Sequence, residues 1–361
     1  MSGRKIAQSV LILIVPMLLV ACGSYNNPPS TPPATAPRLV LVANSISNSI
    51  SSFTVDSTTG QLTAKETVPT GGKNSRIIAL ESSRRFAYVG NSTSNNISIF
   101  AIDANTGHLS AVGSPVSVGS GLGFIVVGPT SNVLYAVNSQ ANGITGFSIN
   151  PSTGALTPLS GTVPTDSAPV QLSFHPSGQF AYLANFNSSD LTVYRVESSG
   201  ALGLLGAVPT GLSPSAISMH PSGNFAYVAS LSSNEITTFS IDQTSGALTA
   251  LSPRAATDSG PNSITIDSQG RFAYVTNAIA SSISVFGIDA ATGGLTLRST
   301  ATAGIIPVSF TLDASGRFAY VANEGSDDIT LFAVDSATGA LTAVGSPVKA
   351  GSGPAWLTVV K

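Results

Sequence analysis

Phe318-Ala319-Tyr320-Val321-Ala322-Asn323 is one copy of a hexapeptide that recurs along this chain. Four further close copies and two looser ones end at Asn91, Asn185, Ser230, Asn277, Asn44 and Asn138. In chain order the last residues stand at 44, 91, 138, 185, 230, 277 and 323, so the steps are 47, 47, 47, 45, 47 and 46 residues. This period indicates one supersecondary unit repeated seven times, whose apolar faces are buried only when neighbouring units stack.

Each repeat predicts four short strands. In the repeat that starts near Pro169 we expect strands at 170–174, 180–184, 191–196 and 202–208, separated by turns rich in Gly, Pro, Ser and Asn. Side chains alternate with a period of two, and no window carries a sustained helical periodicity. Both strand faces are apolar, as in sheets packed between two neighbours. The sequence therefore predicts an all-β, seven-bladed β-propeller with four antiparallel strands per blade.

The two ends of the repeat region predict how the ring closes. The chain enters it at 38–42, which matches a second strand with no first strand before it. It ends with 353–360, which matches only a first strand. We therefore expect the C-terminal strand to complete blade 1.

The turn after the third strand is the most regular one. An Asp or Asn is followed three residues later by Thr or Ser and then Gly; the first residues of this motif are Asp56, Asp103, Asn150, Asp242, Asp289 and Asp335. Such a side chain accepts backbone N–H groups of its own turn, and Gly supplies a positive φ. Because the pattern recurs in almost every repeat, we interpret these residues as turn caps rather than metal ligands. The sequence predicts no metal site and no cofactor.

The N-terminal segment indicates export and lipid anchoring. Residues 1–21 combine a basic start with an apolar run of signal-peptide length, which ends in Leu19-Val20-Ala21-Cys22. This ending resembles the bacterial lipoprotein box, and Cys22 is the only cysteine. Residues 22–37 are rich in Pro, Ser and Thr and predict a spacer before the propeller of residues 38–361. We expect a protein of the bacterial cell envelope, held to a membrane by lipid on Cys22.

Charge and composition narrow the possible partners. The net charge is −2 and charged residues make up 9% of the chain, so nothing favours nucleic acid. No Asp, Glu, Lys or Arg occurs from Ala104 to Thr165, which gives blade 3 a neutral surface. We expect a protein or a carbohydrate-like molecule as the partner of the loop face.

The repeat motifs resemble those of the seven-bladed lactonase family. Gly-x-x-Pro, Pro-Ser-Gly, Phe-Ala-Tyr-Val-Ala-Asn and Ile-Asp-x-x-Thr-Gly-Ala-Leu-Thr carry this resemblance over residues 38–361. The family includes 6-phosphogluconolactonases and muconate-lactonizing propellers, and the chain is also similar to surface-layer propellers with Tyr-Val-Thr-Asn repeats. The resemblance implies a catalytic Arg-His pair at the start of a first strand and a Glu after a second strand. No repeat keeps the pair: Arg76 alone keeps the Arg, and Glu324 alone fits the Glu.

Residues that depart from the repeat predict a site on the loop face. Arg76 and Glu324 are candidate catalytic residues, and the candidate ligand-binding residues are Arg76, Gln171, Asn262, Glu324 and Trp356. Counting blades places Arg76, Trp356 and Glu324 on blades 2, 1 and 7, which are consecutive around a closed ring. There Trp356 could act as a platform for a sugar-like ligand and Arg76 as its polar contact. The alternative is that Trp356 plugs the channel and Arg76 pairs with a loop acid.

Three functions are compatible with these residues. The loss of the Arg-His pair favours a cell-surface or periplasmic binding or scaffold module. The family resemblance, with Arg76 and Glu324, favours a lactonase-type hydrolase that opens a sugar lactone, and export argues against a phosphorylated substrate. A different enzyme, for instance a metal-dependent one that uses Asp327 and Asp328, is the third. The histidines His108, His175 and His220 have no ligand cluster around them and are interpreted as structural.

Overall fold

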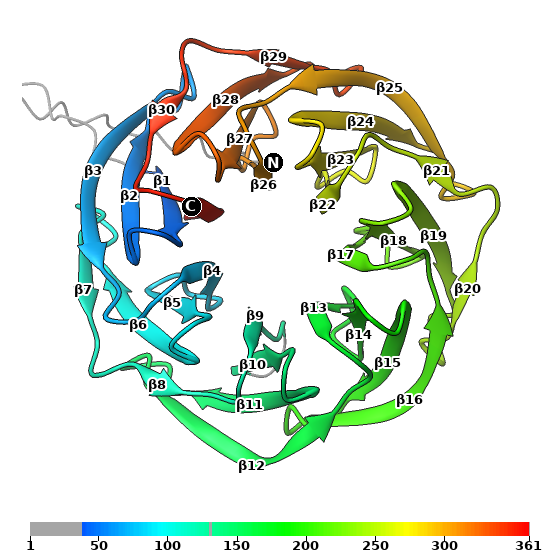
Figure 1. Ribbon diagram of the computed structural model, residues 1–361, viewed down its shortest axis with the longest axis horizontal. Coiled ribbons are helices and arrows are strands. Elements are labelled where there is room, and N and C mark those ends of the chain that lie inside the picture. Colours follow the sequence, from blue (N-terminus) through cyan, green and yellow to red (C-terminus); the bar gives the residue numbers. More distant parts are fainter. Residues whose placement is uncertain (1–37, 130–131, 361) are drawn as a thin grey trace, which may run out of the picture. The chain divides into compact units, whose positions relative to one another are not determined.

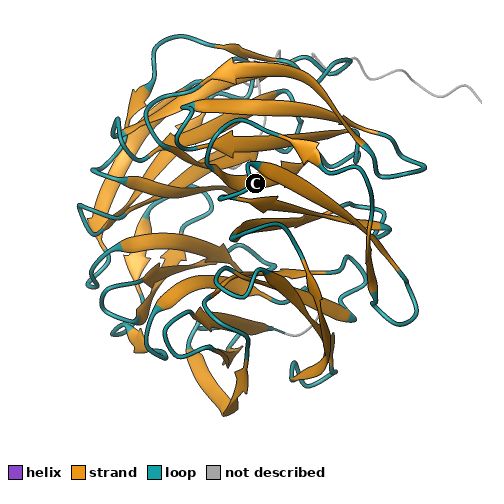
Figure 2. Ribbon diagram, turned by 45° about the vertical axis from the view of Figure 1, so that its right-hand side comes forward, coloured by secondary structure: helices purple, strands orange, loops and turns teal. Residues whose placement is uncertain are grey.

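A computed structural model describes residues 38–129 and 132–360 as seven antiparallel β-sheets arranged in a ring (Figure 1). All regular elements in this part of the chain are strands (Figure 2). The predicted signal peptide, Cys22 and the spacer lie outside the described residues. Within the described part, no helix is long and apolar enough to cross a membrane.

Each sheet is one blade, and its strands run from the ring axis outward. From inside to outside, blade 1 consists of β31 (Pro354–Val360), β1 (Arg38–Asn44), β2 (Ser49–Val55) and β3 (Leu62–Pro69). Blade 2 consists of β4 (Ser75–Leu80), β5 (Phe86–Asn91), β6 (Asn96–Ile102), β7 (Leu109–Ala111) and β8 (Val116–Ser117). Blade 3 consists of β9 (Leu122–Val127), β10 (Val133–Asn138), β11 (Gly143–Ile149) and β12 (Leu156–Pro164).

The other four blades repeat this order. Blade 4 consists of β13 (Pro169–Phe174), β14 (Phe180–Asn185), β15 (Asp190–Val196) and β16 (Leu202–Pro209). Blade 5 consists of β17 (Pro214–Met219), β18 (Phe225–Ser230), β19 (Glu235–Ile241), β20 (Leu248–Ala250) and β21 (Ala255–Ala256). Blade 6 consists of β22 (Pro261–Ile266), β23 (Phe272–Asn277), β24 (Ser282–Ile288) and β25 (Leu295–Thr302). Blade 7 consists of β26 (Pro307–Leu312), β27 (Phe318–Asn323), β28 (Asp328–Val334), β29 (Leu341–Ala343) and β30 (Val348–Lys349).

The seven-bladed propeller with four antiparallel strands per blade is therefore confirmed, with one refinement. In blades 2, 5 and 7 the outer strand is broken into two short pieces. Each break contains a Ser-Pro dipeptide, at Pro115, Pro253 and Pro347. Proline has no N–H to donate to the strand ladder, so it interrupts an outer strand where the other blades continue.

The recurring hexapeptide forms the second strand of each blade and is its most buried part. All six residues of β5, β10, β14, β18, β23 and β27 are buried, whereas the outer strands are mostly exposed. The second strand packs against a neighbouring blade with each face, so both of its faces must be apolar. This explains why the pattern is strongest in the hexapeptide.

Two of the recurring sequence motifs meet between adjacent blades. The Tyr hydroxyl of the hexapeptide donates a hydrogen bond to the carbonyl of the third-turn Gly in the next blade, over 2.6–3.1 Å; the pairs are Tyr88–Gly154, Tyr135–Gly200, Tyr182–Gly246, Tyr227–Gly293 and Tyr320–Gly60. The Phe ring of the same hexapeptide lies against that Gly, and a Cβ on Gly60 would come within 2.5 Å of Phe318. Glycine is therefore required there both by its positive φ and by the neighbouring ring.

The turn caps are confirmed as well. Oδ1 of Asp335 accepts hydrogen bonds from the backbone N–H groups of Ala337 and Thr338, at 2.9 and 2.8 Å. The same pair of bonds forms at Asp56, Asp103, Asn150, Asp242 and Asp289.

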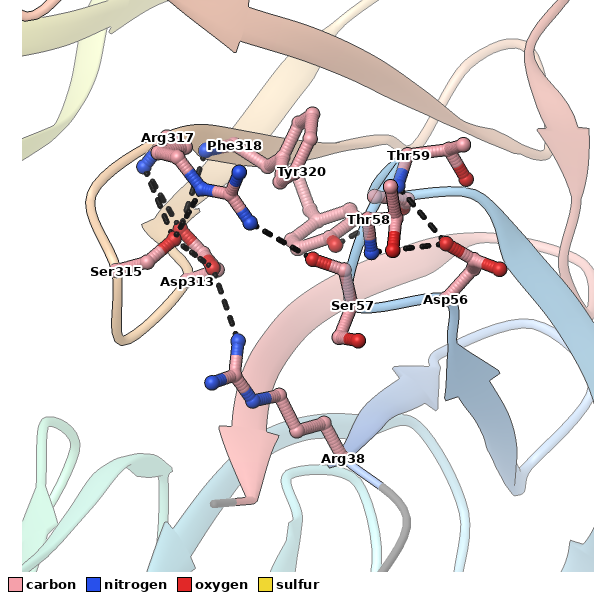
Figure 3. Close-up of polar contacts among 11 residues, drawn as sticks. Arg38, Asp56, Ser57, Thr58, Thr59, Asp313, Ser315, Arg317, Phe318 and Tyr320 are labelled. Carbon is pink, nitrogen blue, oxygen red and sulfur yellow. Dashed lines mark hydrogen bonds and ion pairs between the residues drawn. The ribbon is translucent and has the colours of Figure 1, made fainter.

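Closure of the ring by the C-terminal strand is confirmed. Strand β31 pairs antiparallel with β1 and becomes the inner strand of blade 1. On the side of blade 7, Arg317 Nη2 donates to the carbonyl of Ser57 over 2.8 Å, and Arg38 lies 3.5 Å from Asp313 (Figure 3). The junction of blades 7 and 1 thus has the Tyr–Gly contact of the other junctions and a further ion pair.

Candidate functional site

A cavity of about 510 Å³ lies at the ring axis. Its wall is formed by the inner strands of all seven blades, β31, β4, β9, β13, β17, β22 and β26. The starts of these strands and the loops between second and third strands lie at one end of the ring, which we call the loop face. The opposite end, the turn face, carries the Pro-Ser-Gly turns and the capped third turns.

The wall of the cavity is divided by chemistry. Trp356, Ile77 and Phe124, from blades 1 to 3, form an apolar section. The ring of Trp356 packs edge-on against Phe124, with 5.6 Å between centroids and 76° between planes. Blades 4 to 6 contribute a polar section, which includes Gln171, Ser173, Ser215, Asn262 and Ser263. Trp356 is half-buried, so it narrows the cavity on the apolar side and still lines it.

Arg76 is the only charged residue among those that line the cavity. Its Nη2 lies 3.1 Å from Oε2 of Glu324, and the two side chains are 40% and 20% exposed. Oε1 of Glu324 lies 3.0 Å from the hydroxyl of Ser45. Ser45 is in turn held to β31, because its N–H donates to the carbonyl of Gly353 over 2.7 Å. Blades 7, 1 and 2 thus meet through Glu324, Ser45 and Arg76.

The structure places all five predicted site residues near the loop-face end of the ring, but in two groups. Arg76, Glu324 and Trp356 belong to adjacent blades, as the count of blades predicted. Gln171 and Asn262 line the far side of the cavity. Gln171 Oε1 accepts a hydrogen bond from the N–H of Ile217 over 3.0 Å, which leaves its amide nitrogen available. The Asn262 side chain has no hydrogen-bond partner among the described residues, so both of its polar atoms can serve a ligand.

Two residues at the site were missed by the sequence analysis. Ser45 occupies the Glu position of blade 1, and Phe124 occupies the His position of blade 3. Both were treated as places where family chemistry is absent. The signal that could have found them is the same blade count, which places Ser45 between Glu324 and Arg76.

The remaining polar candidates have structural roles. Asp327 Oδ1 accepts the N–H of Gly353 over 2.7 Å, and Asp328 accepts from Asn323 and lies 3.6 Å from Lys349. His175 and His220 are buried on the turn face, where their Nε2 atoms lie 3.0 and 2.9 Å from carbonyls of the next blade. The structural interpretation of these two histidines is confirmed. His108 is exposed and lies 2.8 Å from Glu66.

The comparison with protein families agrees with this fold. The family model "Lactonase, 7-bladed beta-propeller" matches residues 34–125, 119–210, 171–259 and 217–358. The chain therefore belongs to the lactonase family of seven-bladed β-propellers. None of the curated proteins matches the chain.

Solved structures share the fold over nearly the whole ring. A protein from Lactobacillus plantarum is 23% identical, with a TM-score of 0.80, over 90% of this chain and 100% of that one. A putative 6-phosphogluconolactonase from Bacteroides uniformis is 19% identical, with a TM-score of 0.80, over 90% and 100%. A periplasmic gluconolactonase from Pseudomonas aeruginosa is 20% identical, with a TM-score of 0.80, over 90% and 99%. At these identities the likeness concerns the fold, and the site must be judged from its own residues.

Proposed function

We propose that the protein is a lactonase-type hydrolase that opens a neutral, sugar-like lactone in the cavity at the ring axis. The observation that carries the proposal is the pair formed by Arg76 and Glu324, since it brings the only charge of the cavity wall next to a carboxylate. Lactone opening requires a base for water and a donor for the developing oxyanion. A carboxylate and a guanidinium are one such combination.

The proposed reaction assigns a role to each residue. Glu324 takes a proton from water as the water oxygen bonds to the lactone carbonyl carbon. Arg76 donates hydrogen bonds to the resulting oxyanion, since only one of its five N–H groups is needed for Glu324. When the tetrahedral intermediate collapses, the bond from the carbonyl carbon to the ring oxygen breaks, and Glu324 returns the proton to that oxygen. The product is the open-chain hydroxy acid.

The cavity wall supports a neutral ring as the ligand. Trp356 and Phe124 offer aromatic surface to the C–H groups of a sugar-like ring, and Gln171 and Asn262 offer hydrogen bonds to hydroxyls on the other side. A phosphate group brings about −1.5 to −2 charges. The charge of Arg76 is already balanced by Glu324, so the cavity has no net positive charge to meet a phosphate. We therefore propose an unphosphorylated lactone.

Hydrolysis of δ-gluconolactone and other aldonolactones tests the proposal. We expect turnover by the parent, a loss of roughly 10²–10⁴-fold in kcat for Glu324→Gln, and one of roughly 10²–10³-fold for Arg76→Ala. The matched controls Glu197→Gln and Arg298→Ala alter exposed residues far from the cavity and should retain full activity. Full activity of both site variants would refute the assignment.

A binding module is the second candidate, favoured by the absence of the family's Arg-His pair from every repeat. Trp356 is the only tryptophan of the chain and lines the cavity, so its fluorescence reports occupancy without any chemistry. Saturable quenching by lactones, with no hydrolysis of any of them, would favour the binding module over the hydrolase.

A further inference from the structure

Four isoleucines are exposed together on the loop face. Ile46, Ile279, Ile305 and Ile306, which we call the isoleucine rim, are 66%, 72%, 58% and 43% exposed. They belong to blade 1, blade 6 and the loop between blades 6 and 7, so the rim extends over three consecutive blades. Large apolar side chains gathered in this way on a soluble surface indicate a binding function.

The rim borders the mouth of the cavity. Ile279 lies against Gly260, where a Cβ would come within 2.6 Å of it, and Ile46 lies against Gly353 in the same way, at 2.6–3.1 Å from Ser45 and Ile46 atoms. These glycines immediately precede β22 and β31, and Ile306 immediately precedes β26. The second residue of each of these strands lines the cavity; these residues are Asn262, Ala355 and Val308.

The rim is a local departure from the repeat. The loop position of Ile46 and Ile279 is polar in blades 2 to 5, where it holds Thr93, Gln140, Asn187 and Ser232. In blade 7 it is Gly325, and Ile305 and Ile306 lie over that glycine. None of the four isoleucines belongs to a hydrophobic core cluster of the described residues. Packing of the propeller therefore does not account for them.

Ile306 also has a strained backbone. Its φ is +54°, in the left-handed region that β-branched residues avoid. The equivalent positions before the other inner strands are Asn74, Gly121, Ala168, Ser213, Gly260 and Gly353, none of which is β-branched. A residue kept in an unfavourable conformation, where Gly or Asn would be relaxed, points to selection for its side chain.

The rim directly adjoins the candidate catalytic carboxylate. The backbone N–H of Glu324 donates to the carbonyl of Ile306 over 2.9 Å, and Gly325 follows Glu324 beneath the two isoleucines. A lactone whose carbonyl lies between Arg76 and Glu324 would therefore direct a ring substituent over the rim. On the basis of the proposed function, we infer that the substrates are lactones with an apolar chain on the ring, and that the isoleucine rim binds this chain.

Two probes that differ only in the chain test the inference. δ-Valerolactone has an unsubstituted ring, and δ-decanolactone carries a five-carbon chain on the same ring. We expect δ-decanolactone to quench Trp356 with a Kd at least about tenfold lower, because burial of a few methylenes against the rim corresponds to such a factor. The ratio of the kcat/KM values should change in the same direction. Equal binding of the two probes, or binding of neither, would overturn the inference.

Variants of the rim separate binding of the chain from binding of the ring. Ile279→Ser and Ile306→Gly should each reduce the advantage of δ-decanolactone several-fold and leave δ-valerolactone unchanged. Ile306→Gly should also hold or raise Tm, because Gly adopts the left-handed conformation without strain. The matched control Leu297→Ser removes an equally exposed apolar side chain from outer strand β25 and should change nothing. Rim variants that keep the full chain preference would also overturn the inference.

These outcomes are distinct from those for the proposed function. If δ-decanolactone quenches Trp356 more strongly but no lactone is hydrolysed, the hydrolase proposal fails and the rim assignment stands. If gluconolactone is hydrolysed and the chain has no effect on binding, the rim assignment fails alone.

Discussion

The Asp residues of the third turns show how a single side chain supports the fold. Hydrogen bonds from the backbone and side chain of Thr338 and from the backbone of Ala337 hold the pKa of Asp335 below its usual value of 3.8. The pKa values of Asp56, Asp103, Asp242 and Asp289 are lowered by equivalent bonds. A carboxyl whose pKa is lower in the folded state stabilises that state above the unfolded pKa, and the stabilisation is lost as pH falls through the folded pKa.

Replacement of these five Asp residues by Asn should weaken the acid sensitivity of the protein. Asn keeps an acceptor oxygen but does not titrate, and blade 3 already uses Asn150 in this way. We expect a Tm near that of the parent at pH 7 and a shallower fall of Tm below a pH of about 3.8. The measurement is Tm by calorimetry across this range, with the five Asp→Ala changes as the control that removes the acceptor at every pH. An identical acid profile of parent and Asn variant would contradict the prediction.

At the scale of the element, β31 is the strand on which the ring depends. It contributes Leu357 and Val360 to the cores on the two sides of blade 1, and its loss would expose the inner edge of β1. Deletion of residues 353–361 removes about 1.5–3 kcal/mol for each of the two buried side chains, which corresponds to a fall in Tm of roughly 10 °C. We expect that fall together with aggregation. Removal of Lys361 alone is the control, and a truncated protein that melts as high and as cooperatively as the parent would show that closure does not require β31.

For the whole molecule, we propose anchoring to a membrane through a lipid on Cys22, motivated by Leu19-Val20-Ala21-Cys22. Cys22→Ser should abolish labelling with a fatty-acid analogue and move the protein from the membrane fraction to the soluble fraction, because the apolar transfer energy of the lipid is lost. Ser24→Ala is the control within the same segment. The proposal fails if the Cys22→Ser protein is labelled and sediments like the parent.

The sequence by itself determined the number of blades, the strand order and the closure of the ring, because these follow from local alternation and from the 47-residue step between most copies. It also determined that Arg76, Trp356 and Glu324 share three adjacent blades. Only the tertiary structure decided that Arg76 and Glu324, 248 residues apart, pair with one another beside Ser45. Only it showed Tyr320 bonded to Gly60, 260 residues away, and the isoleucines gathered beside one carboxylate. The physical reason is that periodicity specifies which way a side chain points within its own blade, whereas contacts between blades depend on the distances set when the ring closes.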